Sequence, residues 1–266
     1  MKSTRFSSRN FPNILLEEFK DIREFVQMSD SRPENDWSNH NDPCDTDREW
    51  LLHGWDNARN EIDDQLSKID KVTTAPRKMQ EKIYSYNGYY PSVSRAVRGN
   101  PRCMGKYKNS IKSTKIVEVI WDPGASAGER AETVMKQGIK LLAKIKSLEI
   151  AGYRVRLTVQ GFKGREGYDD AYFCRITIKE ENQPLDLSRI SYPLANVDML
   201  RTWIFHWYEH LPNAKYIGGY GVSLYRWDST RRQEILDAVN VKPNQYYVNL
   251  WTDIENTFKP LLKGEN

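Results

Sequence analysis

The chain has 266 residues, enough to bury a substantial core in one large domain or in two modest ones. Aromatic residues make up 12% of it, which excludes a disordered chain, and its net charge of only +4 does not by itself indicate nucleic-acid binding. No apolar run approaches the roughly 20 residues that cross a bilayer, and three widely spaced cysteines fit neither a disulfide framework nor a zinc ribbon. We therefore expect a globular protein without a membrane partner, in a reducing compartment.

The N-terminal part of the chain is predicted to be mainly helical. Residues 13–28 carry apolar side chains at helical spacing, which indicates an amphipathic helix. Residues 29–47 are rich in Asp, Asn, Ser and Pro, which favours a loop. A second helix is expected to begin near Thr46 or Asp47 and to run to Ile69. Residues 1–113 are therefore interpreted as a mainly helical N-terminal extension that ends in a basic connector.

The connector contains the densest group of basic residues in the chain. Residues 87–105 hold three Gly and two Pro around the sequence SRAVRG, which resembles one helical turn. Nucleic-acid grooves combine cations with aromatic stacking surfaces, and Tyr107 lies within the group. The alternative is an ordinary solvated face. The candidate nucleic-acid-binding residues lie within an 18-residue stretch: Arg95, Arg98, Arg102, Lys106, Lys108 and Lys112.

A buried strand, a turn and a long helix follow. The sequence KIVEVIW predicts a strand at 115–121, and DPGASAG predicts a turn. The following helix is expected to stop at Gly152, with Lys136, Lys140 and Lys144 facing solvent. Alternating residues at 153–162 and 172–178 then indicate a hairpin.

The C-terminal part alternates between the two kinds of element. Residues 198–211 are predicted to be helical, 216–227 extended, 229–240 helical, 245–251 extended and 252–262 helical. These patterns predict an α/β domain over residues 114–266, with a mostly parallel sheet, an antiparallel edge hairpin and helices on both faces.

The strand, turn, helix and hairpin together resemble the opening of a von Willebrand factor A domain. In that family the turn carries a D-x-S-x-S metal site, and the matching positions here are Asp122, Gly124 and Ser126, so the middle hydroxyl is missing. The family's site also needs an Asp after a later strand, where Asp228 follows SLYRW. The resemblance implies a Mg²⁺ site formed by Asp122, Ser126 and Asp228, since Mg²⁺ prefers oxygen ligands. The alternative is that the turn only caps the helix.

A wider resemblance covers residues 47–212. The segments at 87–104, 138–157 and 184–207 are similar to an uncharacterised family of bacteriophage proteins of unknown function. This resemblance implies a phage origin, and a location in the cytoplasm of the infected host cell or in the virion. It implies no activity and no catalytic residues.

No complete catalytic motif is present, so we expect a protein that acts by binding and needs no cofactor, apart from Mg²⁺ if the metal site forms. The leading interpretation is a phage-encoded, non-enzymatic interaction protein, either an adaptor or a component of the virion or its assembly, with a protein partner. The DPGAS turn and the basic connector are its expected surfaces, because open α/β sheets bind ligands beyond the carboxyl ends of their strands. One alternative is a nucleic-acid-binding factor in phage transcription, replication or packaging. A second alternative is a metal-dependent hydrolase.

Overall fold

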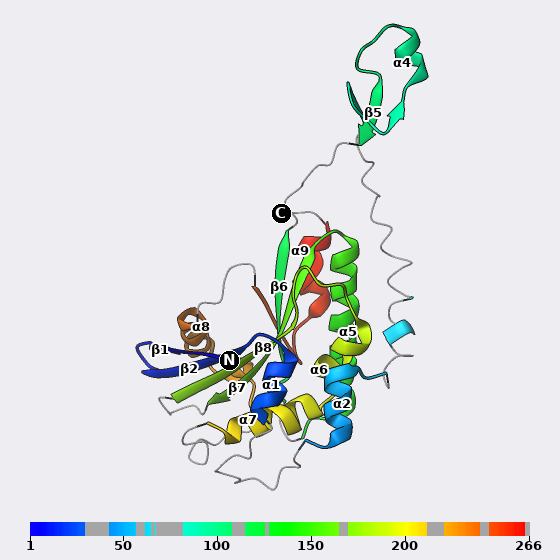
Figure 1. Ribbon diagram of the computed structural model, residues 1–266. Helices are drawn as coiled ribbons and strands as arrows, with labels where there is room; N and C mark the ends of the chain where they lie inside the picture. The colour runs from blue at the N-terminus through cyan, green and yellow to red at the C-terminus, as the bar shows by residue number, and fades with distance from the viewer. Residues whose placement is uncertain are drawn as a thin grey trace. The chain divides into compact units, whose positions relative to one another are not determined.

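The computed structural model describes residues 1–29, 43–56, 62–64, 67, 82–107, 115–125, 128–164, 170–211, 221–239 and 245–263. The chain divides into two compact units (Figure 1). One unit consists of residues 1–72 and 115–266, and the other of residues 73–114. The larger unit contains a six-stranded sheet and the smaller a three-stranded sheet.

The six-stranded sheet has the order β1-β2-β8-β7-β6-β9. Its parallel pairs are β2–β8, β6–β7 and β6–β9, and its antiparallel pairs are β1–β2 and β7–β8. The predicted mostly parallel sheet and the predicted hairpin are therefore confirmed. The hairpin of β7 and β8 does not form the predicted edge, however, because β2 pairs with β8 on the side opposite β7. The strands are β1 (Lys2–Phe6), β2 (Asn13–Phe19), β6 (Ile116–Asp122), β7 (Arg154–Gly164), β8 (Asp170–Lys179) and β9 (Gln245–Asn249).

The predicted helix over residues 13–28 is wrong at its beginning. Residues 13–19 form β2, and only α1 (Ile22–Ser29) is helical. Along β2 the side chains alternate between two cores: Ile14 and Leu16 lie in one, and Phe19 lies in the other. This period of two, fixed by pairing with β8, replaces the helical period. The N-terminal residues therefore contribute two strands to the sheet and do not form the mainly helical extension that we predicted.

One face of the sheet carries the larger apolar core. It is covered by α1 and by four further helices, α2 (Asp45–His53), α5 (Ala131–Ile150), α6 (Leu187–Ala195) and α9 (Ile254–Lys263). Figure 1 shows α5 and α9 together along this face. The core continues into a π-helical turn at Met199–Ile204 and α7 (Phe205–Glu209), and it includes the fully buried Trp121, Trp203 and Trp207. The prediction for Lys144 is wrong, because this side chain is buried and its Nζ lies 2.5 Å from Oε2 of Glu255.

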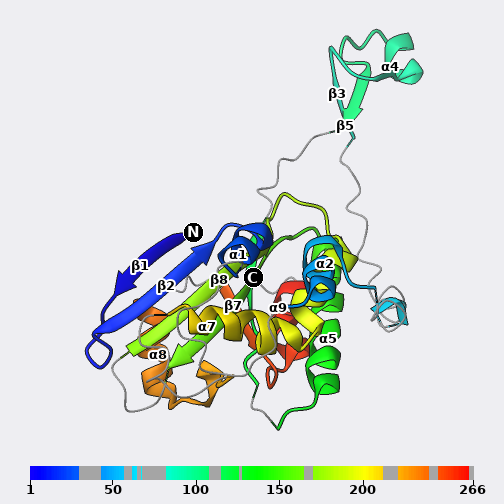
Figure 2. The ribbon, with the colours of Figure 1, turned by 60° about the horizontal axis from the view of Figure 1, so that its bottom comes forward.

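The described residues cover only part of the opposite face. Here α8 (Ser229–Ala238) and a 3₁₀ turn, η3 (Leu224–Arg226), pack on a smaller core that contains Phe162, Phe173 and Trp227. Figure 2 shows α8 on the other side of the sheet from α5. Helices on both faces are thus confirmed, whereas the predicted extended structure is wrong for Leu224–Arg226. Among the described helices, none is long and apolar enough to span a membrane.

The smaller unit contains a three-stranded antiparallel sheet of order β3-β5-β4, formed by β3 (Lys82–Ser85), β5 (Met104–Tyr107) and β4 (Tyr90–Pro91). The short helix α4 (Val93–Val97) confirms the predicted helical turn. The ring of Tyr90 crosses directly over Gly105, where an added Cβ would lie 2.2 Å from the ring. A side chain larger than that of glycine would therefore push Tyr90 off the sheet. We call residues 82–107 the basic module.

Candidate functional site

Asp122 lies at the carboxyl end of β6, as the sequence predicts, and is only 1% exposed. Its Oδ2 accepts hydrogen bonds from the hydroxyls of Ser223, at 2.7 Å, and Tyr247, and its Oδ1 accepts one from the backbone N–H of Gly124 at 2.8 Å. Burial raises the pKa of Asp122, and the three hydrogen bonds act in the opposite direction by stabilising the ionised form. The carboxylate thus joins the DPGAS turn, the loop before η3 and strand β9.

The other predicted metal ligands do not join Asp122 within the described residues. Asp228 caps the N-terminus of α8: its Oδ1 accepts hydrogen bonds from the backbone N–H groups of Thr230 at 2.9 Å and Arg231 at 3.4 Å, which lower its pKa. Ser126 lies outside the described residues. Among the residues that the structure describes, no group of three or more His, Cys, Asp or Glu side chains is arranged to hold a metal ion. The Mg²⁺ site therefore stays a prediction.

An exposed aromatic pair lies on the two segments that contact Asp122. Tyr225 of η3 and Trp251, just after β9, are 46% and 41% exposed, and their rings stack with centroids 6.5 Å apart. Arg226 lies 5.2 Å from the Trp251 ring, and Arg232 lies 4.7 Å from the Tyr225 ring. Tyr, Trp and Arg are the residue types that dominate protein-binding hot spots. We call these four residues the aromatic stack.

The basic module concentrates positive charge without any acidic residue. Residues 82–107 contain five basic and five Tyr residues, and their charge of +5 exceeds the +4 of the whole chain. The rest of the protein is therefore slightly acidic, and the net charge conceals the module. Of residues 84–106, where burial is described throughout, only Gly105 is buried. The large apolar side chains that the module exposes are Tyr86 at 63%, Tyr89 at 85%, Val93 at 71% and Val97 at 81%.

Two of the predicted binding residues stack on aromatic rings of the module. The guanidinium carbon of Arg95, on α4, lies 4.0 Å from the centre of the Tyr84 ring. That of Arg102 lies 5.6 Å from the centre of the Tyr86 ring. Such cation–π contacts hold a guanidinium group beside a π-face while its N–H groups remain able to donate. The structure thus places two of the predicted cations beside aromatic rings, while their binding to nucleic acid stays a prediction.

Of the other four candidate nucleic-acid-binding residues, the structure describes two. Arg98 follows α4 and is exposed, and Lys106 lies on β5 opposite Ile83. Lys108 and Lys112 lie outside the described residues. Four of the six predicted residues therefore belong to the described module: Arg95, Arg98, Arg102 and Lys106.

A hollow of about 330 Å³ lies on the part of the sheet that α8 leaves uncovered. Arg175 of β8 lines it; its Nε donates to Oε1 of Gln160 at 2.8 Å, and its buried Nη2 has no hydrogen-bond partner among the described residues. Burial lowers the pKa of Arg175, while the carboxylates of Glu18 and Glu118 favour its charged form. The sequence pattern did not identify this position, because Arg175 alternates with apolar residues on an ordinary strand.

Ser223 is the second residue that the sequence did not identify. It contacts Asp122 from a segment 101 residues away and lies in a sequence that reads as a strand. No local motif marks Ser223, so its contact with Asp122 is visible only in the folded structure.

A family model described as "Domain of unknown function (DUF7192)" matches residues 3–265. No curated protein and no solved structure matches the chain.

Proposed function

We propose that the protein acts by binding single-stranded nucleic acid through the basic module. The premise is that the chain belongs to the family described as "Domain of unknown function (DUF7192)", and this membership assigns no activity. One observation carries the proposal: residues 82–107 contain no acidic residue, hold Arg95 and Arg102 against tyrosine rings, and expose Tyr86 and Tyr89. In the phage setting that the sequence resemblance implies, such a protein would act in transcription, replication or packaging.

The chemistry of the module supports a single strand more than a duplex. Bases of a single strand are free to stack on aromatic rings, and each such stack contributes about 1–3 kcal/mol. Tyr89 and Tyr86 offer exposed rings for this purpose, and the neighbouring cations would contact phosphates. The absence of carboxylates in residues 82–107 removes the repulsion that a phosphate backbone would otherwise meet.

The proposal is tested with fluorescently labelled DNA and RNA strands of about 16 nucleotides, a length within the site sizes of known single-strand binders. Anisotropy titrations at several salt concentrations give the affinity and its salt dependence. Arg95→Ala with Arg102→Ala is expected to weaken binding by about tenfold or more and to reduce the salt slope by about 1.4, for two lost phosphate contacts. Tyr89→Ala is expected to weaken binding without changing the slope.

The matched control is Arg130→Ala with Arg154→Ala, which removes two exposed guanidinium groups from the larger unit. This variant is expected to bind like the wild type. The proposal is wrong if neither DNA nor RNA binds at low salt, or if the control and the module variant lose affinity equally.

The aromatic stack supports a second candidate function, that of a protein adaptor. The order of strand, turn, long helix and hairpin supports a von Willebrand A-like core, in which a partner would bind beyond the carboxyl ends of β6 and β9. Exposed Trp251 and Tyr225 would be its anchors. A tagged protein recovered from infected cells would then retain a protein partner after nuclease treatment, and Trp251→Ala would release that partner whereas the module variant would not.

A further inference from the structure

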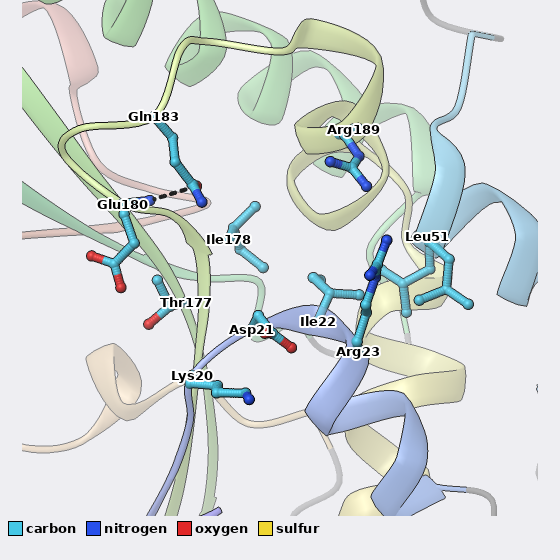
Figure 3. Close-up of a pocket in the computed structure, with 11 residues that line it drawn as sticks. Lys20, Asp21, Ile22, Arg23, Leu51, Thr177, Ile178, Glu180, Gln183 and Arg189 are labelled. Atoms are coloured by element: carbon cyan, nitrogen blue, oxygen red, sulfur yellow. Dashed lines mark hydrogen bonds between the residues drawn. The ribbon is translucent and has the colours of Figure 1, made fainter.

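A pocket of about 320 Å³ lies in the larger unit, where the start of α1 meets the last turn of α2, the end of β8 and the first turn of α6. Three basic side chains line it: Lys20 from the segment before α1, Arg23 from α1 and Arg189 from α6. Figure 3 shows Arg23 and Arg189 pointing toward each other across the pocket. We call these three residues the cation triad.

The charge of the cation triad is only partly compensated: Glu24 interacts electrostatically with Lys20, and Asp21 lines the same pocket. None of the three side chains of the triad forms an ion pair or a side-chain hydrogen bond with another described residue. Of the two acidic residues that line the same pocket, Glu180 is paired with a cation outside the triad, whereas Asp21 keeps its negative charge. Asp21 accepts the backbone N–H of Glu24 at 2.9 Å, and Glu180 pairs with Arg156 at 2.8 Å.

The three side chains are exposed, so water screens their mutual repulsion, and an anion bound at the pocket would be attracted by all three charges. Arginine forks fit the geometry of phosphate oxygens, and two forks facing one space suit a doubly charged group. The charge of the triad therefore matches a dianion better than a monoanion.

Beside Thr177 and Gln183, the uncharged part of the lining consists of four apolar residues. Leu51 is buried, and Ile22, Leu52 and Ile178 are partly buried. We call these four residues the apolar wall. A volume of about 320 Å³ lies near the lower end of the range that small-molecule sites occupy. The pocket thus offers an anion site beside a surface for a compact apolar group.

We propose that this pocket binds a small phosphate monoester with an apolar or aromatic body. The dianionic phosphate lies against the cation triad, and the body lies against the apolar wall. This site belongs to the larger unit alone and does not depend on nucleic-acid binding by the basic module.

The test is an isothermal titration of the full chain with phenyl phosphate. Benzoate carries the same ring on a single charge, and inorganic phosphate carries the dianion without the ring. We expect phenyl phosphate to bind more tightly than either. Arg23→Gln with Arg189→Gln is expected to weaken phenyl phosphate binding by about tenfold or more, while Arg130→Gln with Arg154→Gln, the charge-matched control, leaves it unchanged.

Ile178→Thr separates the two parts of the pocket. It keeps the branched shape that suits a strand but makes the apolar wall more polar, so it is expected to weaken phenyl phosphate and to leave inorganic phosphate unaffected. Thermal melting of each variant checks that the fold is intact. The proposal is overturned if phenyl phosphate gives no saturable binding at millimolar concentrations or binds no better than benzoate. It is also overturned if the variant Arg23→Gln with Arg189→Gln binds phenyl phosphate as tightly as the wild type does. If that variant at the same time loses affinity for oligonucleotides, the pocket is part of a nucleic-acid-binding surface.

Discussion

The six-stranded sheet and the basic module differ in how far their large apolar side chains are exposed. In the core on this sheet, Trp121 of β6, Trp203 of the π-helical turn and Trp207 of α7 are fully buried. In the module, Tyr89 and Val97 are more than 80% exposed, although the module is folded into strands and a helix of its own. The exposed apolar side chains of the module therefore contribute little to a core, and exposed apolar patches mark binding surfaces.

Deleting one part of each unit gives the largest contrast. Removal of residues 1–20 takes away β1 and β2, leaves β8 as an exposed edge and opens both cores, so we expect an insoluble protein or one without cooperative unfolding. Replacing residues 82–107 with about 10 Gly and Ser residues is expected to change the free energy of unfolding by only ~1 kcal/mol. None of the eight tryptophans lies in the module, so urea unfolding followed by Trp fluorescence reports on the larger unit. Equal losses from the two deletions would refute the contrast.

Single substitutions compare a buried aromatic side chain of the larger unit with an exposed one of the module. Trp121→Ala empties a fully buried site on β6 and is expected to lower the free energy of unfolding by about 3–5 kcal/mol. Tyr89→Ala, in the module, is expected to change it by less than about 0.5 kcal/mol. Urea unfolding followed by circular dichroism measures both. Trp121→Phe should cost less than Trp121→Ala, because it keeps most of the ring and removes an indole N–H that has no hydrogen-bond partner among the described residues. A large effect of Tyr89→Ala would mean that the module has a core that its exposure does not show.

Burial of charge gives a smaller effect that depends on pH. Lys163 of β7 is fully buried, with its Nζ 5.2 Å from the centre of the Tyr208 ring. Burial lowers the pKa of Lys163 to about 8, although the carboxylate of Glu209 partly opposes this shift. The unfolded chain therefore binds more protons than the folded protein between about pH 8 and 10.5, and the contribution of Lys163 to stability rises with pH across that window.

Lys163→Met removes this contribution. Its stability advantage over the wild type is expected to be largest below about pH 8 and to shrink by up to ~3 kcal/mol by pH 10.5. Denaturant unfolding at several pH values measures the difference, in which the titrations of other groups cancel. Lys136→Met, on the exposed side of α5, removes the same charge without emptying a buried site. A difference that stays constant with pH would show that Lys163 is not buried in its neutral form.

The local patterns of the sequence were sufficient for the centre of the sheet. From Ile116 to Lys179 the strand, long helix and hairpin follow from alternation, period and turn residues, because each element is decided by residues close to it in the chain. The cation–aromatic composition of the module was equally local. The net charge of the whole protein does not show it, because the rest of the chain is slightly acidic.

The features that the sequence predicted wrongly or did not identify share one physical cause, which is contact between residues far apart in the chain. Residues 13–19 satisfy a helical period, yet their pairing with β8 overrides it. Lys144 looks like one of three solvent-facing residues until Glu255, 111 residues later, comes to lie beside it. Ser223 becomes a partner of Asp122 only when the sheet has formed. The triad pocket joins residues from four separate elements, so no sequence window contains it.

The pairing of β2 with β8 has a consequence for synthesis of the chain. Asn13 lies opposite Asp170, and 157 residues separate them. At the usual rate of about 5–20 residues per second, the ribosome needs on the order of ten to thirty seconds to make the partner that β2 requires. Throughout that interval the apolar residues of β2 lack the strand that pairs with them in the folded protein. A chain released before Lys179 would not contain all of β8, and we expect it to expose β2 and to aggregate.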